Sequence, residues 1–312
     1  MQFMRLVRPV RRKNTGRFLR RFCSVAFALL FLSLTGAGCA EESRFTPLPI
    51  DDSPGLVAPE SAYLPEEKGY KDDSLQVRIE TDRAYNTDIM LAYVTIVHPS
   101  QMRTTMAGRY GTTKVASPGI LARRVNAVLA INGDFFNYRN TGYLVRQGEL
   151  LRDNPSDKYD LMILDENGDF VIIQDPTEEK IADYKGTIIN SFNFGPALVM
   201  DGKQVTPVKH IDKGSRKKAQ RVAACQTGPL SYLFIATAGP ENYGSAGLTL
   251  DEFSEYVSGI GGIKTAYNLD GGSSSAIVLN GVKINTRKIR ELCDMIYFST
   301  LIPAEQEQTE EN

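Results

Sequence analysis

The feature that most constrains the fold of this 312-residue chain is a series of short apolar runs separated by turn dipeptides. After Tyr143 these runs are short, and glycine-containing turns such as Asn167-Gly168 and Asp201-Gly202 divide them. Alternation with a period of two, interrupted by Asn-Gly or Asp-Gly, is typical of antiparallel hairpins. The segment LMILDENGDFVII is the plainest example. The pattern therefore predicts a β-rich fold.

Further apolar or alternating runs predict strands at 75–80, 89–97, 127–131, 221–226, 232–238, 266–269, 276–279 and 296–301. Only two helices are well supported. Ser117-Pro118 supplies an N-cap and an N1 proline for a helix through Val125. Thr249 and Glu252 form a capping box for a second helix. The order of elements predicts a single α+β domain, with a mixed, largely antiparallel β-sheet core and a few flanking helices, and argues against a doubly wound fold.

The N-terminus has the pattern of an export signal. Residues 1–39 contain eight basic residues and no acidic one, and an uncharged, mostly apolar stretch follows from Phe22. Small residues precede Cys39, which sits where a bacterial lipoprotein would carry its acylated cysteine. Three alternatives remain for residues 1–40: a lipoprotein signal, ordinary cleavage near Ala40, or retention as a membrane anchor. In each case residues 41–312 lie outside the cytoplasm.

The rest of the chain divides into three parts. Residues 41–73 mix proline, acidic and small polar residues, which predicts a flexible tether between membrane and domain. We expect the folded domain at 74–302 and a disordered acidic tail at 303–312.

Charge and cysteine content exclude some functions. Outside residues 1–39 the chain has 28 basic and 37 acidic residues, a net charge of −9, which argues against nucleic-acid binding. Cys225 and Cys293 form either one disulfide or two free buried thiols. With His98 and His210 they show no zinc-ligand spacing. We predict no cofactor, and no ligand motif supports a divalent cation, although carboxylates could hold one.

The stretch TAYNLDGGSSSAIVLNGVKIN, residues 265–285, contains more polar groups than a chain reversal needs. A buried strand ends at Asp270, and Gly271, Gly272 and three serines precede the next strand and its Asn280-Gly281 turn. Glycine lets a backbone approach closely, and N–H and O–H groups donate to phosphate oxygens. The stretch is suited to hold an anion beside a carboxylate; a glycine-serine loop with an aspartate turn cap is the simpler alternative.

A second polar stretch, AINGDFFNY, follows a buried strand at residues 130–138. Two phenylalanines directly after Asn-Gly-Asp are unusual for a simple hairpin. The segment is interpreted either as a pocket rim, where amides and rings hold a sugar, or as a turn anchored by core aromatics.

Arginine at the start of a strand is a third candidate feature. Arg221 presents a planar fork suited to phosphate or carboxylate, or else is a solvated or surface-paired residue. Arg290 has the same two interpretations and a weaker case. The basic segment 207–219 is interpreted as an exposed loop, with attraction of an anionic substrate as a minor alternative.

Together these segments resemble the phosphodiester glycosidase family. AINGDFFN, FNFGPALVMDGK, RVAACQTG, SAGLTLDEFSEYV, AYNLDGGSSSAIVLNGVKIN and CDMIYF occur in one order between Leu75 and Leu301. The resemblance implies hydrolysis of a sugar-1-phosphodiester, resembling a GlcNAc-1-phosphodiester, at the anomeric carbon. Its phosphate leaving group, with a second pKa of about 6, departs without a strong general acid. The implied setting is processing of a cell-surface polysaccharide, exopolysaccharide or glycan.

The resemblance also implies site residues. The implied catalytic residues are Asp270, Arg221 and, ranked below them, Asp134. The implied substrate-binding residues are Asn132, Gly133, Phe135, Phe136, Gln226, Asn268, Gly271, Gly272, Ser274 and Ser275. The implied partners are a phosphorylated glycan or sugar-phosphate diester and, through the N-terminal segment, a membrane.

Two alternative functions remain. A non-catalytic glycan-binding or exopolysaccharide-assembly module is favoured by the change from the family's usual Arg-Thr-Ala-Ile-Gly to Arg221-Val222-Ala223-Ala224-Cys225. A phosphodiesterase that cleaves the P–O bond is the other alternative.

Overall fold

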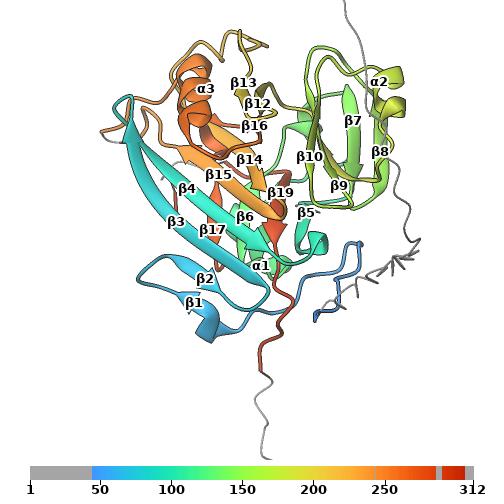
Figure 1. Ribbon diagram of the computed structural model, residues 1–312, viewed down its shortest axis with the longest axis vertical. Helices are drawn as coiled ribbons and strands as arrows, with labels where there is room; N and C mark the ends of the chain where they lie inside the picture. The colour runs from blue at the N-terminus through green and yellow to red at the C-terminus, as the bar shows by residue number, and fades with distance from the viewer. Residues whose placement is uncertain (1–43, 243, 286–289, 306–312) are drawn as a thin grey trace, which may run out of the picture. The chain divides into compact units, whose positions relative to one another are not determined.

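The computed structural model describes residues 44–242, 244–285 and 290–305 (Figure 1). The predicted signal or anchor at 1–40, with Cys39, and most of the predicted acidic tail lie outside the described residues. Among the described residues, no helix has the length and apolar character needed to cross a membrane.

Strands dominate this part of the chain, and every strand pair among the described residues is antiparallel. The predicted α+β class with a largely antiparallel core is confirmed. The largest sheet within the described residues has nine strands in the order β1 (Tyr63–Leu64), β2 (Gly69–Lys71), β3 (Leu75–Ala84), β4 (Thr87–Ile96), β15 (Ser231–Thr237), β14 (Val222–Gly228), β16 (Thr265–Leu269), β12 (Ala197–Met200) and β13 (Lys203–Gln204).

A second sheet packs against the first. Its described strands have the order β18 (Val282–Lys283), β17 (Ile277–Leu279), β6 (Leu129–Asn132), β19 (Asp294–Phe298) and β5 (Met102–Met106). The main core lies between the two sheets, where Phe234 meets Phe298 with ring centroids 5.6 Å apart. Because successive residues of a strand point to opposite faces, each sheet has a second apolar face to cover.

Helices cover these outer faces. Leu250, Phe253 and Val257 of α3 (Leu250–Gly259) pack on the nine-stranded sheet, and α1 (Pro118–Arg124) packs on the five-stranded sheet. The predicted capping box of α3 is present, with Glu252 N–H donating to Thr249 Oγ1 at 3.2 Å. Sequence analysis missed the short α2 (Glu178–Asp183), which shows only one buried residue. The 3₁₀ turns are η1 (Glu60–Ala62), η2 (Pro99–Gln101), η3 (Phe136–Tyr138) and η4 (Gly272–Ser274).

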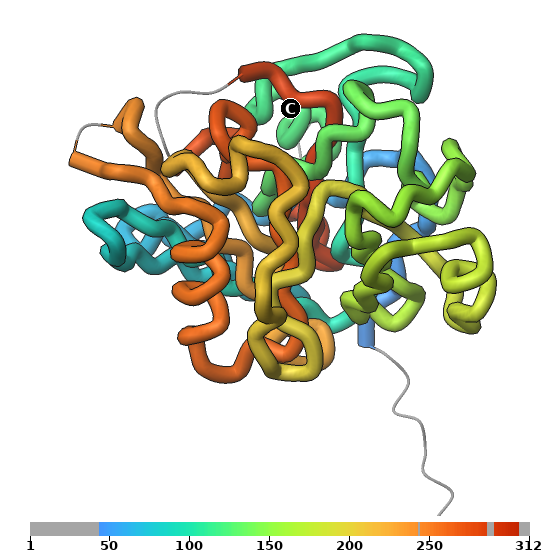
Figure 2. The backbone as a smooth tube through the Cα atoms, turned by 90° about the horizontal axis from the view of Figure 1, so that it is seen from above, coloured from blue at the N-terminus to red at the C-terminus, as the bar shows by residue number. Residues whose placement is uncertain are grey.

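The remaining strands form two small sheets, whose described members are β10 (Phe170–Ile173), β9 (Leu161–Asp165) and β11 (Ile188–Phe192) in one and β7 (Gly142–Arg146) and β8 (Glu149–Asn154) in the other. Phe170 pairs with Leu164 across the predicted Asn167-Gly168 turn. Figures 1 and 2 show β7 to β11 together with α2 on the side away from α3.

The domain begins earlier than the sequence indicated. Residues 44–73 belong to the predicted flexible tether, but β1 and β2 join the nine-stranded sheet and Tyr70 is fully buried. Leu48 N–H donates to Ser100 Oγ at 2.9 Å, and Arg103 Nη2 donates to the Pro49 carbonyl at 2.9 Å. These contacts correct the boundary: residues 44–73 pack as part of the domain.

The two cysteines of the domain do not pair. Cys225 and Cys293 are both free and buried, and burial raises the pKa of each thiol. Free thiols are therefore the alternative that the structure supports.

Candidate active site

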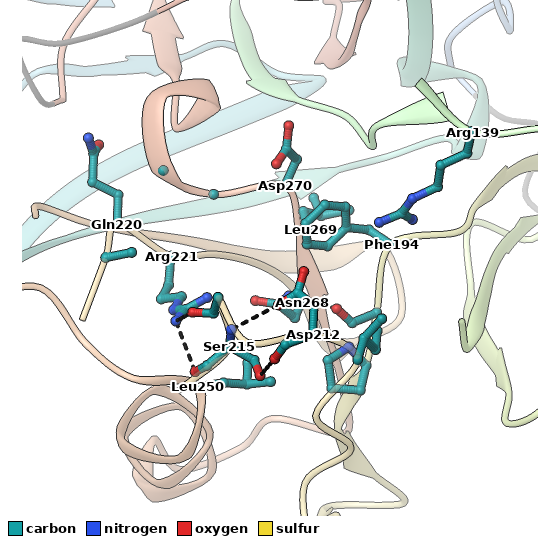
Figure 3. Close-up of a pocket in the computed structure, with 17 residues that line it drawn as sticks. Arg139, Phe194, Asp212, Ser215, Gln220, Arg221, Leu250, Asn268, Leu269 and Asp270 are labelled. Carbon is teal, nitrogen blue, oxygen red and sulfur yellow. Dashed lines mark hydrogen bonds between the residues drawn. The ribbon is translucent and has the colours of Figure 1, made fainter. Parts of the chain in front are cut away.

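The candidate site is a cavity of about 250 Å³ at the ends of β14 and β16 (Figure 3). Val222 pairs with Leu269 where these central strands end, so Arg221 and Asp270 leave the sheet next to each other. The cavity is lined by Arg139, Phe194, Gly195, Pro196, Ile211, Asp212, Gly214, Ser215, Ala219, Gln220, Arg221, Leu250, Asn268, Leu269, Asp270, Gly271 and Gly272. Arg221 and Asp270, separated by 49 positions in the sequence, thus share one wall.

Glycines allow the chain to turn at this place. A Cβ on Gly271 would collide with the carbonyl oxygen of Gln220, and Gly272 has φ +57°. Gly272 N–H donates to the same Gln220 carbonyl at 2.9 Å. Close backbone approach therefore explains Gly271, positive φ explains Gly272, and the Gly272 N–H is occupied by protein.

Asp270 is the carboxylate of the site. Its side chain is 13% exposed, and it accepts a hydrogen bond from Arg290 Nη2 at 2.6 Å. Burial raises the pKa of Asp270, while Ser274 and Arg290 act to lower that pKa. Asp270 lines both the main cavity and a smaller one that contains Arg290 and the buried Ser274. A carboxylate with a raised pKa at a cavity wall is a candidate catalytic group.

Two arginines lie close to this carboxylate. The Arg290 guanidinium is 4.9 Å from the Phe135 ring centroid and 5.6 Å from that of Tyr138. Arg139 lies 5.7 Å from the same Phe135 ring, and it also lowers the pKa of Asp270. Arg139 forms no ion pair with a carboxylate among the described residues; its Nη1 donates to the Asn193 carbonyl. The Phe135 ring thus contacts two guanidinium groups near Asp270, and two cations at this place suit the binding of an anion.

Arg221 has a different role from the one predicted. Its Nε donates to the Leu248 carbonyl at 3.0 Å, and its Nη2 donates to the carbonyls of Gly214, Ser215 and Lys217 at 3.1, 3.1 and 2.7 Å. Burial lowers its pKa. These contacts fix the segment 214–217 as a wall of the cavity. The interpretation of 207–219 as a loop with mostly exposed residues is confirmed.

Asn132, Gly133 and Asp134 lie beneath the site. Asn132 is 1% exposed; its Nδ2 donates to the Asp270 carbonyl at 2.7 Å, and its Oδ1 accepts from Ala276 N–H at 3.0 Å. It positions Asp270 and has no free amide hydrogen for a sugar. A Cβ on Gly133 would collide with the carboxylate of Asp294. Asn132 therefore positions Asp270, whereas the sequence predicted that it contacts a sugar.

Asp134 belongs to a buried ion-pair cluster. Arg146 Nη2 is 3.2 Å from Asp134 Oδ1 and 2.7 Å from Asp294 Oδ2, and all three side chains are at most 3% exposed. Asp134 also accepts from the N–H groups of Phe136 and Asn193, at 3.1 and 2.8 Å. These contacts assign Asp134 a structural role in place of the predicted catalytic one.

Asn268 does face the cavity. Its Nδ2 donates to the Gly195 carbonyl at 2.7 Å, while its Oδ1 has no hydrogen-bond partner among the described residues. The donor contact fixes the orientation of the amide, so Oδ1 is a buried acceptor at the cavity wall without a partner among the described residues.

Three further predicted residues contribute less directly. Phe136 is buried, 5.3 Å from the Arg146 guanidinium, and Ser275 Oγ accepts from Asn285 Nδ2 at 3.2 Å. Gln226 pairs with Thr265, four residues along β14 from the cavity end, which is roughly 13 Å at the usual strand rise. Its side chain bonds Phe170 N–H and Asp169. The structure therefore removes Gln226 from the site.

Sequence analysis missed Arg139, Phe194, Asp212 and Ser215 as cavity residues and ranked Arg290 too low. Arg139 directly follows the AINGDFFNY stretch, and Phe194 lies in FNFGPALVMDGK, so a wider boundary around each motif would have included them. Within 44–242, 244–285 and 290–305, no three His, Cys, Asp or Glu side chains gather to hold a metal ion.

The fold and cavity define an antiparallel β protein with a carboxylate-arginine site at the ends of two central strands. A model of the phosphodiester glycosidase family (NAGPA) matches residues 125–299, more than half of the chain. The chain belongs to this family of hydrolases, which confirms the resemblance seen in the sequence. The matched range contains Asp270, Arg290 and Arg139.

A solved structure of a relative shares this fold at low sequence identity. The catalytic domain of zebrafish N-acetylglucosamine-1-phosphodiester alpha-N-acetylglucosaminidase, auto-inhibited by its pro-peptide, matches with a TM-score of 0.58 and 15% identity. That match covers 83% of this chain and 99% of the zebrafish chain. A hypothetical protein from Synechocystis matches with a TM-score of 0.48 and 15% identity, over 72% of this chain and 62% of that chain. No curated protein matches this chain in sequence.

Proposed function

We propose that this protein is an exported glycosidase that hydrolyses a sugar-1-phosphodiester, such as a GlcNAc-1-phosphodiester, at the anomeric carbon. The observation that carries the proposal is the partly buried Asp270, paired with Arg290 at 2.6 Å on the wall of a cavity that Arg139 also lines. Family membership and the fold shared with the zebrafish enzyme support it.

The residues of the cavity can divide the reaction between them. Arg139 and Arg290 offset the charge of the leaving phosphate, and Asn268 Oδ1 accepts a hydrogen bond from the sugar. The bond between C1 and the phosphate oxygen breaks, and its electron pair leaves with the phosphate. Water adds to C1 and transfers a proton to the Asp270 carboxylate, which passes it to solvent. Because the released phosphate monoester has a second pKa of about 6, no second carboxylic acid is needed.

The structure weakens the case for a non-catalytic module. The residues after Arg221 that differ from the usual family pattern lie on β14, where Val222 and Ala224 face one apolar core and Ala223 and Cys225 face the other. These residues therefore lie in the apolar cores on the two faces of the nine-stranded sheet, and none of them lines the cavity.

The cellular setting is part of the proposal. The basic and apolar segment at 1–40 supports export, with attachment through Cys39, retention as an anchor, or secretion. We infer an extracytoplasmic enzyme that processes phosphorylated surface polysaccharide, exopolysaccharide or glycan.

Product identity tests the proposal. We expect the purified protein to release free GlcNAc from UDP-GlcNAc or from a GlcNAc-1-phosphodiester. Release of GlcNAc-1-phosphate would instead indicate P–O cleavage, and binding without product would indicate a glycan-binding module. We expect Asp270→Asn to lower kcat at least about 100-fold, because it removes the base. Asp73→Asn, at an exposed aspartate that pairs with Arg44 at 2.7 Å, is the matched control. Full activity in Asp270→Asn would exclude the mechanism.

A further inference from the structure

Three exposed basic residues occur in the segment that forms part of the cavity wall. Lys213, Arg216 and Lys217 form no ion pair within the described residues. Their basic neighbours behave differently. Lys209 is 2.5 Å from Asp175, His210 is 3.1 Å from Asp251, and Lys218 is 3.0 Å from Glu252.

The three cations alternate in the chain with residues of the cavity wall, although they are not themselves among the lining residues. They occur within the segment 211–220, where Asp212, Gly214 and Ser215 line the cavity wall. Consecutive Cα atoms are about 3.8 Å apart, so each cation is one or two residues from a wall residue. One carboxylate, Asp212, is in the same segment, and its Oδ1 accepts from Ser215 N–H at 3.0 Å. We call the segment 211–218 the rim. Among the residues that the structure describes, its unpaired charges are mostly positive.

The rim is held in place by Arg221. Its Nη2 bonds three carbonyls of the segment, including that of Lys217 at 2.7 Å, and Leu250 N–H donates to the Ser215 carbonyl at 2.8 Å. A backbone with this many fixed contacts keeps the attachment points of its side chains in place, so binding need not order the loop. Most of the protein is acidic, with 28 basic and 37 acidic residues outside residues 1–39. The rim reverses that charge locally.

The proposed reaction already provides partners for one phosphate. Arg290 and Arg139 lie near Asp270, where the scissile phosphodiester must be. Lys213, Arg216 and Lys217 add exposed positive charge to the segment that forms part of the cavity wall, and this charge suits further negative charge on the leaving group.

We propose that the segment 211–218 binds the leaving group of the substrate, and that this group carries at least one phosphate beyond the scissile diester. The inference rests on the proposed function, because it defines the leaving group of that reaction. A nucleoside diphosphate and a chain of phosphodiesters share this chemistry. In either case the C1–O bond breaks, its electrons leave with the nearer phosphate, and water supplies the new hydroxyl at C1.

Equilibrium binding tests the proposal without requiring turnover. The full-length protein is titrated with UMP and UDP, which differ by one phosphate. We expect UDP to bind roughly tenfold more tightly, since its additional phosphate meets several exposed positive charges, each of which contributes little by itself. We expect this preference to shrink at high salt, because the rim is exposed.

The rim variant Lys213→Gln/Arg216→Gln/Lys217→Gln should lose the preference for UDP. The control Lys71→Gln/Lys185→Gln/Lys203→Gln removes the same number of exposed charges elsewhere and should keep it. An equal preference in the rim variant and the wild type, or no preference in the wild type, would overturn the proposal.

Kinetics separate this inference from the proposed function. UDP-GlcNAc and methyl GlcNAc-1-phosphate carry the same sugar and differ in leaving-group charge. We expect the rim variant to lower kcat/KM roughly tenfold for the first and little for the second. If the wild type and the rim variant release GlcNAc from UDP-GlcNAc with equal kcat/KM, the proposal about the rim is wrong and the proposed hydrolase activity stands. If the preference for UDP depends on the rim but no sugar is released, the rim binds phosphate as proposed and the proposed hydrolase activity is wrong.

A third ligand distinguishes the two sources of additional phosphate. A glycerol phosphate trimer presents phosphodiesters without a nucleoside. If the trimer binds more tightly than UDP and its binding depends on the rim, the leaving group is a phosphodiester polymer. If UDP binds more tightly, the leaving group is a nucleotide. If neither binding depends on the rim, the proposal is wrong.

Discussion

At the scale of single residues, the site depends on which arginine meets which partner. The Arg221 guanidinium donates to backbone carbonyls, whereas the Arg290 guanidinium pairs with the Asp270 carboxylate. An arginine that bonds carbonyls organises the backbone, and one that bonds a buried carboxylate sets the charge of the site. The two residues therefore serve different purposes although both lie near Asp270.

This difference predicts opposite outcomes for two matched substitutions. Arg290→Gln should lower kcat/KM roughly 100-fold with a small change in stability, since a charge near the reacting group is lost. It should also move the acidic limb of the pH–rate profile to higher pH. Arg290 lowers the pKa of Asp270, so its loss lets burial raise that pKa further, and Asp270 loses its charge at a higher pH.

Arg221→Gln is the comparison. It should cost on the order of 2–3 kcal/mol of stability, since carbonyls of the segment 214–217 lose their donor, and it should leave the acidic limb where it is. Denaturant titration and pH–rate profiles of both variants provide the measurements. A shifted limb in Arg221→Gln and an unshifted one in Arg290→Gln would contradict these assignments.

At the scale of elements, the site depends on how closely the turn after β16 passes the start of β14. Gly271 lies against the Gln220 carbonyl, and the N–H of Gly272 bonds the same oxygen at 2.9 Å. The turn is thus anchored to the neighbouring strand, which carries Asp270 to the cavity wall.

Adding one methyl group should disturb this turn. We expect Gly271→Ala to cost about 1–3 kcal/mol through overpacking and to lower activity by displacing Asp270. Gly261→Ala is the control, because a Cβ there has no heavy atom within 4 Å. Urea midpoints and kcat of both variants test this. Normal activity in Gly271→Ala would mean that the turn tolerates displacement.

Elements of this kind were largely predictable, but side-chain partners were not. The alternation around Asn167-Gly168 and the capping box at Thr249 depend on local sequence, and both are present. The resemblance implied Asn132, Arg221 and Asp270 as residues of one site; Arg221 and Asp270 line the same cavity, and Asn132 bonds the Asp270 carbonyl. The role of Gln226, in contrast, depends on the register of β14 against β16, which places it at the far end of the strand. The partner of Arg290 depends on tertiary packing against Phe135, which no local pattern encodes.

At the scale of the whole molecule, one buried ion-pair cluster connects parts of the fold beneath the site. Arg146 from β7 lies between Asp134, which follows β6, and Asp294, which begins β19. One guanidinium cannot neutralise two carboxylates. Burial raises the pKa of Asp294 to about 7. Arg146 acts to lower this pKa, and the nearby Asp134 acts to raise it.

This cluster predicts how the stability of the protein changes with pH. Unfolded, Asp294 loses its proton near its ordinary pKa of 3.8; folded, it keeps the proton until about pH 7. Between these values the folded state binds more protons, so the contribution of Asp294 to stability falls as pH rises and levels off above pH 7. Asp294→Asn resembles the protonated form at every pH. We therefore expect the stability of the variant relative to the wild type to increase between pH 5 and 8, by at most about 3 kcal/mol. Urea midpoints of both proteins at four pH values measure this difference, and parallel curves would show that Asp294 is already ionised in the folded protein at pH 5.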